Sequence, residues 1–295
     1  MNLVLQTLVS TLVQGSMLAL ITIGMNLVYG TLRVLNMAQG VMVMVGGIAA
    51  WTFVANLGWS PWLAMILAMV IAALLGMLSY AVGISRLIGR AGIDFEMTAF
   101  ISTFAIASIL QNLVQLFYGP RQKDFPALVP GRLQITEGVS ITWHQVLTAV
   151  IAIAALSALG VFLAKSRYGL AIVAVAQNLD AARLMGIPAR RAYVLTMGLA
   201  AGLAGLAGVL LAPVYFVSPN MGDLPMLQAL IVAIFAGLGS TRGTIIAAYI
   251  IGFVQAAVSI FWTSTYAMPV LYALIVVVLI ARPYGIAGKP QEARL

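Results

Sequence analysis

The chain has 295 residues, of which 63% are hydrophobic and only 7% are charged, whereas about a quarter of the residues in a soluble domain are charged. This composition excludes a water-soluble globular protein. The formal charge is +8 and cysteine is absent, which excludes disulfides, thiolate nucleophiles and cysteine-ligated metals. At roughly 20 apolar residues per span, we expect an all-α polytopic membrane protein of about eight to ten transmembrane helices, some of them broken or re-entrant.

Uncharged stretches divide the chain into candidate spans, all within a single transmembrane domain over residues 1–295. The predicted ranges are 5–30, 38–55, 61–85, 97–118, 143–164, 191–213, 225–238, 244–262 and 267–281. The first has no basic region or cleavage signature before it, so we interpret it as a retained span and not a signal peptide. The seventh lies between Pro225 and a glycine cluster and is too short for a full span, which favours a broken or re-entrant helix.

The first span carries a polar stripe. At 100° per residue its polar side chains fall within an arc of roughly 120°. These residues are Thr7, Thr11, Gln14, Thr22, Asn26 and Tyr29. Two interpretations stay open: hydrogen bonding between helices, which polar side chains in membranes supply, and a wall of a translocation path.

The basic residues predict the orientation, because Lys and Arg in short loops stay on the cytoplasmic side. Nine crossings with the N-terminus outside place twelve of the 15 basic residues inside. Those twelve are Arg33, Arg86, Arg90, Lys165, Arg167, Arg183, Arg190, Arg191, Arg242, Arg282, Lys289 and Arg294. Only Arg121, Lys123 and Arg132 then lie outside.

Two polar segments connect the spans. The outer segment, residues 119–142, contains an alternation of apolar residues around Glu137-Gly138 that is typical of a small hairpin. The inner segment, residues 165–191, carries a net charge of +4. Its middle, from Asn178 to Met185, predicts a short helix, with Asn178 as the cap and Gly186 as the stop. A solvated loop is the alternative, and a helix presented to a cytoplasmic partner is favoured.

Acidic residues are few, and the span map places all seven in loops or at the tail, with none at mid-membrane. Proton relays usually keep an ionisable group inside the helix bundle, so the map counts against a proton-driven carrier. The chain also lacks a HExxH, a GxSxG and a Walker GxxxxGK[ST] sequence. We therefore predict no enzyme, no catalytic residues, no metal, no cofactor and no nucleic-acid partner.

Four segments together resemble one family. The inner segment Gly169–Ile187 looks like the cytoplasmic signature of the branched-chain amino acid ABC importer permeases of the LivH type. The turn Leu35–Gly40, the glycine-rich turn Ala236–Ser240 and the ending Arg282–Gly288 are similar to further motifs of that family. The four occur in the family's order, and the resemblance extends over nearly the whole chain.

The resemblance implies a permease subunit that translocates branched-chain or related amino acids across the bacterial inner membrane. Its implied partners are cytoplasmic ABC ATPase subunits, which hydrolyse the ATP, a second permease subunit and a periplasmic solute-binding protein. We assign the coupling to the ATPase to Asn178, Asp180, Ala181, Ala182, Arg183 and Gly186. We assign the translocation path to Asn26, Asn36, Gln39, Gly40, Gly239 and Ser240.

Other functions remain open at this stage. Neutral walls fit a zwitterion but would also pass urea or a short-chain amide, so a permease for such solutes in the same superfamily is an alternative. An ion-coupled secondary carrier with broken helices near Asn36 and Gly239 is another, and it should work without an ATPase. A membrane-embedded enzyme or scaffold is a third, and the missing intramembrane acid, His or Cys constellation argues against the enzyme.

Overall fold

A computed structural model describes residues 2–89, 94–136, 139–282 and 284–288. Within these residues the regular structure is helical apart from one hairpin. The helices are α1 (Asn2–Leu32), α2 (Gln39–Trp51), α3 (Pro61–Ser79), α4 (Phe95–Tyr118), α5 (Trp143–Lys165), α6 (Arg167–Gln177), α7 (Leu179–Leu184), α8 (Ala189–Tyr215), α9 (Asp223–Ala236), α10 (Thr241–Phe261) and α11 (Ala267–Ala281). Short π-helical turns extend α2 over Thr52–Asn56 and α3 over Tyr80–Ile84, and a 3₁₀ turn at Ser264–Tyr266 precedes α11.

The membrane spans follow the apolar stretches of the sequence. Among the described residues, 8 helical segments are long and apolar enough to cross a bilayer. They match eight of the nine predicted ranges to within a few residues, which confirms the all-α polytopic fold. The remaining range is α9, whose 14 residues extend only about 21 Å at 1.5 Å per residue.

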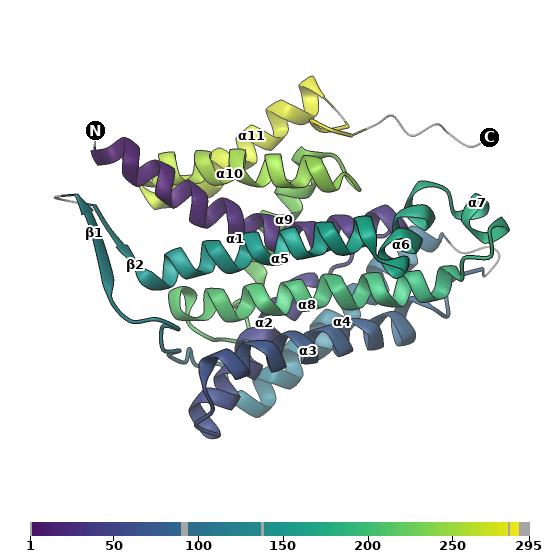
Figure 1. The fold of residues 1–295 in the computed structure, drawn as a ribbon, viewed down its shortest axis with the longest axis horizontal. Helices are drawn as coiled ribbons and strands as arrows, with labels where there is room; N and C mark the ends of the chain where they lie inside the picture. The colour runs from purple at the N-terminus through teal and green to yellow at the C-terminus, as the bar shows by residue number, and fades with distance from the viewer. Residues whose placement is uncertain (1, 90–93, 137–138, 283, 289–295) are drawn as a thin grey trace.

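The long helices lie side by side with the two polar segments at opposite ends (Figure 1). Strands β1 (Arg132–Thr136) and β2 (Val139–Thr142) pair antiparallel at one end, which we call the outer end after the predicted orientation. Helices α6 and α7 lie at the other, inner end. The predicted hairpin is confirmed, although its apex, Glu137-Gly138, lies outside the described residues, as do Arg90, Lys289, Glu292 and Arg294.

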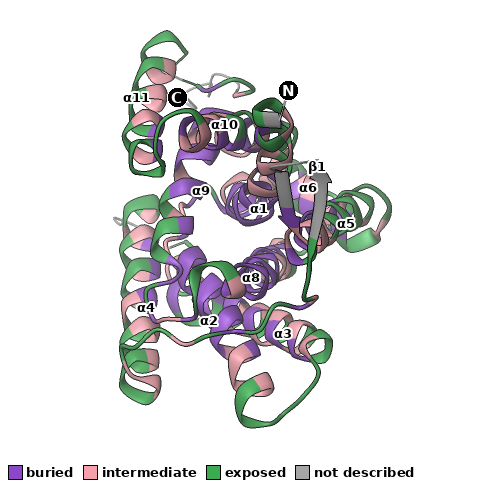
Figure 2. Cartoon of the chain, turned by 90° about the vertical axis from the view of Figure 1, so that its left-hand side faces the viewer, coloured by how far each residue is buried: buried purple, intermediate pink, exposed green. Residues whose placement is uncertain are grey.

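Close helix packing builds the core around α1, α2 and α8, which lie at the centre when the molecule is viewed along its length (Figure 2). A β-carbon at Gly46 of α2 would overlap the backbone of Gly205 of α8, and one at Gly208 would overlap the carbonyl oxygen of Val43. Glycine therefore sets the distance between α2 and α8, as small residues do where membrane helices pack closely.

Helices α4 and α11 lie at the edge of the molecule, and exposed residues dominate both (Figure 2). Only 11% of the most apolar stretch of each is buried, against 78% for α8. This protomer therefore leaves one side of α4 and of α11 uncovered.

The segment after α8 returns into the molecule instead of staying at the outer end. Val217 pairs with Lys123 of the outer segment, and five residues later a β-carbon at Gly222 would overlap Gly40, near the start of α2. Helix α9 then runs to Gly237–Ser240, and Gly239 lies against Gly30 near the inner end of α1. The re-entrant prediction for this segment agrees with this path.

One acidic residue lies on this path. The sequence map placed every acidic residue outside the spans, and Asp223, which precedes the predicted range 225–238, is the first residue of α9. It follows Gly222 at its contact with Gly40, which the chain reaches through the loop Phe216–Gly222.

Candidate functional site

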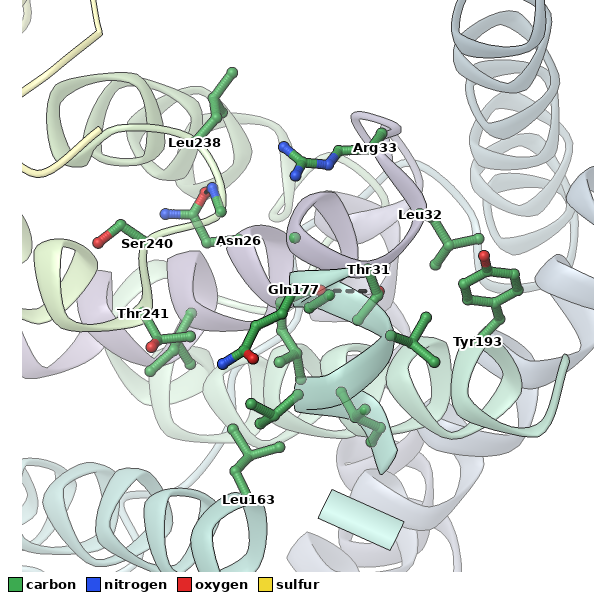
Figure 3. A pocket seen from close by; sticks show the side chains of 18 of the residues that line it. Asn26, Thr31, Leu32, Arg33, Leu163, Gln177, Tyr193, Leu238, Ser240 and Thr241 are labelled. Carbon is green, nitrogen blue, oxygen red and sulfur yellow. Dashed lines mark hydrogen bonds between the residues drawn. The ribbon is translucent and has the colours of Figure 1, made fainter. Parts of the chain in front are cut away.

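A large cavity opens at the inner half of the molecule, with a volume of about 1760 Å³. Its wall combines the second half of α1, the last turns of α5, helix α6 and the glycine-rich turn before α10 (Figure 3). Three residues predicted for the translocation path, Asn26, Gly239 and Ser240, line it. Two of the predicted coupling residues, Asn178 and Arg183, line it as well.

Asn26 joins two elements of the wall. Its side-chain amide donates to the hydroxyl of Thr244 on α10, and its carbonyl oxygen accepts from the backbone N–H of Gly239 at 3.4 Å. The side chain is fully buried in the protomer and lies beside Ser240 in the close-up (Figure 3). Asn26 therefore fits both interpretations of the polar stripe. It forms hydrogen bonds to a second helix, and it lies at the cavity wall.

The glycine-rich turn is held in place by the end of the chain. The N–H of Ile286 donates to Phe235 at 2.9 Å, and the N–H of Ala287 donates to Ala236 at 3.0 Å. A β-carbon at Gly243 would press on Ala287. Two motifs far apart in the sequence, Ala236–Ser240 and Arg282–Gly288, therefore form one structural unit at the cavity.

The predicted coupling helix is present as α7. The side chain of Asn178 accepts from the backbone N–H groups of Asp180 and Ala181, both at 3.1 Å, and so satisfies two donors that a helix start leaves free. Gly186 follows with φ +77°, a left-handed conformation that glycine adopts without strain. Arg183 and Asp180 lie 3.9 Å apart on the exposed surface, a contact that adds little stability.

The side chains of this segment divide between two faces. Ala182 is 4% exposed and packs into the protomer, whereas Ala181 is exposed. Leu184 and Met185 project outward, with 88% and 82% of their surface exposed. The sequence reasoning did not single out these two residues, although a pair of large apolar side chains beside a helix stop is visible in the sequence.

The other predicted path residues lie away from the cavity, in the packed interior. Asn36 is 2% exposed, and its side-chain oxygen accepts from Ala38 in a local turn. Gln39 is fully buried and donates to the carbonyl oxygen of Ala200 on α8 at 3.0 Å, while its own amide oxygen has no partner. Gly40 lies against Gly222. The structure thus separates the two groups of predicted path residues.

Arg33 marks the inner end of α1. It lies at the cavity and has φ +60°, a conformation that costs a non-glycine residue free energy. Its N–H still donates to the carbonyl of Tyr29 at 2.9 Å, so the residue closes the helix in the position where glycine is usual. The guanidinium adds a positive charge to the inner opening.

Lys123 ties the outer segment to the bundle, and Phe125 and Leu128 of the same segment are buried in the core. The ammonium of Lys123 lies 3.9 Å from the centre of the Trp51 ring and 5.1 Å from that of Tyr118, and its backbone pairs with Val217. These cation–π contacts make Lys123 part of the outer framework. Arg121 is exposed.

In the described part of the chain, no group of three His, Asp or Glu side chains comes together. The sole histidine of the sequence, His144, is buried, and its Nε2 atom lies 3.0 Å from the carbonyl oxygen of Leu210 on α8. It therefore joins α5 to α8.

Comparison with known proteins gives consistent results. Residues 7–279 match the family model described as branched-chain amino acid transport system / permease component. The chain is 32% identical to the high-affinity branched-chain amino acid transport system permease protein BraD of Pseudomonas aeruginosa, over 99% of this chain and 98% of that protein. It is also 32% identical to the corresponding protein LivH of Escherichia coli K12, over 99% and 97%.

One solved structure shares the fold. It is PsaBC from Streptococcus pneumoniae in complex with a Fab, with a TM-score of 0.51 and 15% identity over 95% of this chain and 91% of that chain. A more distant relative, the nucleoside ABC transporter permease protein NupB of Lactococcus lactis, is 32% identical over 50% of this chain and 42% of its own.

Proposed function

Because the chain belongs to the family of permease components of branched-chain amino acid transport systems, we propose that it is the membrane permease subunit of an ATP-binding cassette importer. Its solutes are branched-chain or related amino acids, and its membrane is the bacterial inner membrane. Cytoplasmic ATPase subunits hydrolyse the ATP, a second permease subunit completes the membrane part, and a periplasmic protein delivers the solute.

The observation that carries the coupling part of this proposal is the exposed apolar tip after α7. Leu184 and Met185 are almost fully exposed at the inner end, beside a helix whose start is capped by Asn178. Large apolar side chains that project into water mark surfaces that a partner covers. The positive inner opening, with Arg33, Arg183 and Arg242 at the cavity, lies next to this tip.

The cavity supports the transport part. It places Asn26, Gly239 and Ser240 on its wall near the inner end, so we assign these three to the inner section of the path. Asn36, Gln39 and Gly40 lie in closed packing between α1, α2 and α8. We propose that this region is the constriction that separates the cavity from the outer side when the path is closed at that point.

Two alternatives differ in measurable ways. A permease for urea or short-chain amides would not need a site for an ammonium group, and an ion-coupled carrier would not need an ATPase. The two relatives that are 32% identical over 99% of the chain, BraD and LivH, are named for branched-chain amino acids, which favours the amino acid over the amide.

Uptake in a reconstituted system tests the function. Vesicles that contain the permease with its ATPase and binding protein should accumulate labelled leucine when ATP is supplied on the ATPase side. They should not do so with ADP, or without the ATPase. Accumulation driven by an ion gradient alone would support the carrier, and uptake of urea but not leucine would support the amide permease.

The coupling tip has its own test. The double change Leu184→Ser and Met185→Ser should leave folding intact, since both side chains are exposed, and should reduce copurification of the ATPase and leucine uptake by more than about tenfold, as loss of a central apolar anchor does. The matched control is Leu116→Ser and Phe117→Ser, a pair that is 78% and 77% exposed near the outer end of α4. Equal ATPase binding by all three proteins would remove the tip from the mechanism.

A further inference from the structure

Helix α4 carries a polar stripe on its uncovered side. Ser108, Gln111, Asn112 and Gln115 recur at the i, i+3, i+4 and i+7 spacing of one helix face. Asn112 and Gln115 are exposed, and Ser108 and Gln111 are partly exposed. Exposed apolar residues flank this stripe, among them Ile109, Leu113 and Leu116, and we assign that flank to lipid. A face that met only lipid would not carry the amides.

The stripe meets the start of α9. The side-chain amide of Gln111 donates to the side-chain oxygen of Asn220 at 3.2 Å and lies 3.4 and 3.5 Å from the two carboxylate oxygens of Asp223. Both Asn220 and Asp223 are exposed. Within the described part of the chain, no Lys or Arg forms an ion pair with Asp223. The carboxylate therefore has an amide donor on one side and is open on the other.

The cluster of Gln111, Asn220 and Asp223 lies deeper in the molecule than a pair of aromatic rings near the outer end. The rings of Trp51 and Tyr118 pack 6.3 Å apart where α2 and α4 end. Gln111 precedes Tyr118 by seven residues, which is about 10 Å along α4. Gly222 packs on Gly40, eleven residues before Trp51, which is about 16 Å along α2. Trp and Tyr gather at membrane interfaces. With these two rings at the outer interface, the carboxylate lies within the hydrocarbon core.

Lipid cannot be the medium that covers this carboxylate. Charged side chains within membrane spans face the interior of a bundle or a water-filled cavity, because exposure to hydrocarbon is costly. In this chain the cluster faces outward, beside α4, whose most apolar stretch is only 11% buried. A second permease subunit, as the proposed function requires, would close this side off from lipid and leave the cluster beside the path.

We propose that Asp223 and Gln111 form a binding site for the ammonium group of the transported amino acid, on the wall of the path between the two permease subunits. This inference rests on the proposed function and adds a recognition site to it. The Asp223 carboxylate accepts from the ammonium, and Gln111 orients the carboxylate through its own N–H. Leu224 and Leu227, 40% and 47% exposed, follow Asp223 on α9 and contact the apolar side chain of the solute.

The chemistry of the site selects its ligand. A carboxylate with a free side favours a cation. The amide of Asn112 donates one N–H to the carbonyl oxygen of Ser108 at 2.7 Å, and its second N–H and the amide of Gln115 donate to a carboxylate about one helical turn away. An aliphatic amino acid matches all three groups: its ammonium binds the Asp223 carboxylate, its carboxylate binds the amides, and its side chain contacts the two leucines. Urea has no cation for Asp223. Charge-assisted hydrogen bonds of this kind are stronger than those between neutral groups.

The first experiment is uptake by Asp223→Asn, which keeps the size of the side chain and removes its charge. In vesicles that contain the complete complex, the Michaelis constant for leucine uptake should rise by more than about tenfold, with unchanged copurification of the ATPase and the second permease subunit. The control, Asp124→Asn, removes an exposed carboxylate from the outer segment and should leave uptake unchanged. Normal uptake by Asp223→Asn, or a complex that no longer assembles, would overturn the site.

The second experiment does not depend on any solute. The sequence has no cysteine, so Asn220→Cys supplies a single thiol beside Asp223. In the assembled complex this thiol should react faster with a cationic than with an anionic thiosulfonate reagent, and Asp223→Asn should abolish that preference. An unreactive thiol, or one with no charge preference, would contradict the inference. If the preference holds while the wild type takes up no leucine, the proposed function fails and the cation site stands.

Discussion

Helices α8 and α4 are both long enough to span a membrane, yet one is largely buried within this chain and the other is largely exposed. In α8, 78% of the most apolar stretch is buried, and in α4 only 11% is. The buried helix presents glycine and alanine to its neighbours, whereas the uncovered helix presents amides and a serine. Small residues therefore mark contacts completed within this chain, and we propose that polar residues on an uncovered helix mark a surface that a second subunit completes.

The largest effect is expected when a bulky side chain is introduced into α8. Gly208→Leu should prevent stable folding, because even a β-carbon there overlaps the carbonyl oxygen of Val43. The cost should reach or exceed the upper end of the ~1–3 kcal/mol typical of overpacking. The matched control is Gly160→Leu in α5, where a β-carbon meets no atom within 4 Å. Monodispersity and thermal unfolding in detergent measure the difference, and equal stability of the two variants would contradict the packing account.

A smaller effect is expected at a polar residue inside the packed region. Asn26→Ala removes the bonds to Thr244 and to the N–H of Gly239 and should lower the free energy of unfolding by about 2 kcal/mol. It should also loosen the glycine-rich turn at the cavity. Thr11→Ala is the control, since its hydroxyl bonds only within its own helix. Thermal unfolding that is the same for both variants would mean that Asn26 does not join the two elements.

The sequence predicted the spans well because uncharged apolar stretches alone define them. It also predicted α7, because Asn178 and Gly186 are local signals of a helix start and stop. It did not predict the neighbours of Asp223, because the preceding loop is held by contacts such as Gly222 with Gly40, and such tertiary contacts leave no local pattern. It did not separate Asn26 from Gln39 either, since both are polar residues near turns and only packing decides which one reaches the cavity.

The polar stripe on α4 is visible in the sequence, although the sequence analysis assigned it no role. The α4 stripe has helical spacing within a predicted span, as clear as the stripe on the first span. Its structural meaning depends on exposure, because the same spacing describes an interhelical contact when the face is buried. Asn26 on α1 illustrates the buried case, because its buried side chain donates to the hydroxyl of Thr244 on α10.

The smallest effect is expected at Lys123, where the outer segment contacts the rings at the ends of α2 and α4. Lys123→Glu loses the cation–π contacts with Trp51 and Tyr118 and should destabilise the fold by ~1 kcal/mol. Arg121→Glu should leave stability unchanged, because Arg121 is exposed. We propose that this segment docks the solute-binding protein, so Arg121→Glu should weaken docking, and more strongly at low salt. Equal docking affinity for wild type and Arg121→Glu at low salt would remove Arg121 from that surface.

The most direct test of the contrast between α8 and α4 is a cysteine scan of α4 in the assembled complex. Single cysteines at residues 108–116 are treated with a charged, water-soluble thiosulfonate reagent, which reacts only where water is present. We predict reaction at Ser108, Gln111, Asn112 and Gln115, and none at Ile109, Leu113 and Leu116, which are exposed apolar residues on the side assigned to lipid. Uniform reactivity, or reactivity confined to the apolar positions, would contradict the claim that the polar face of α4 borders the aqueous path.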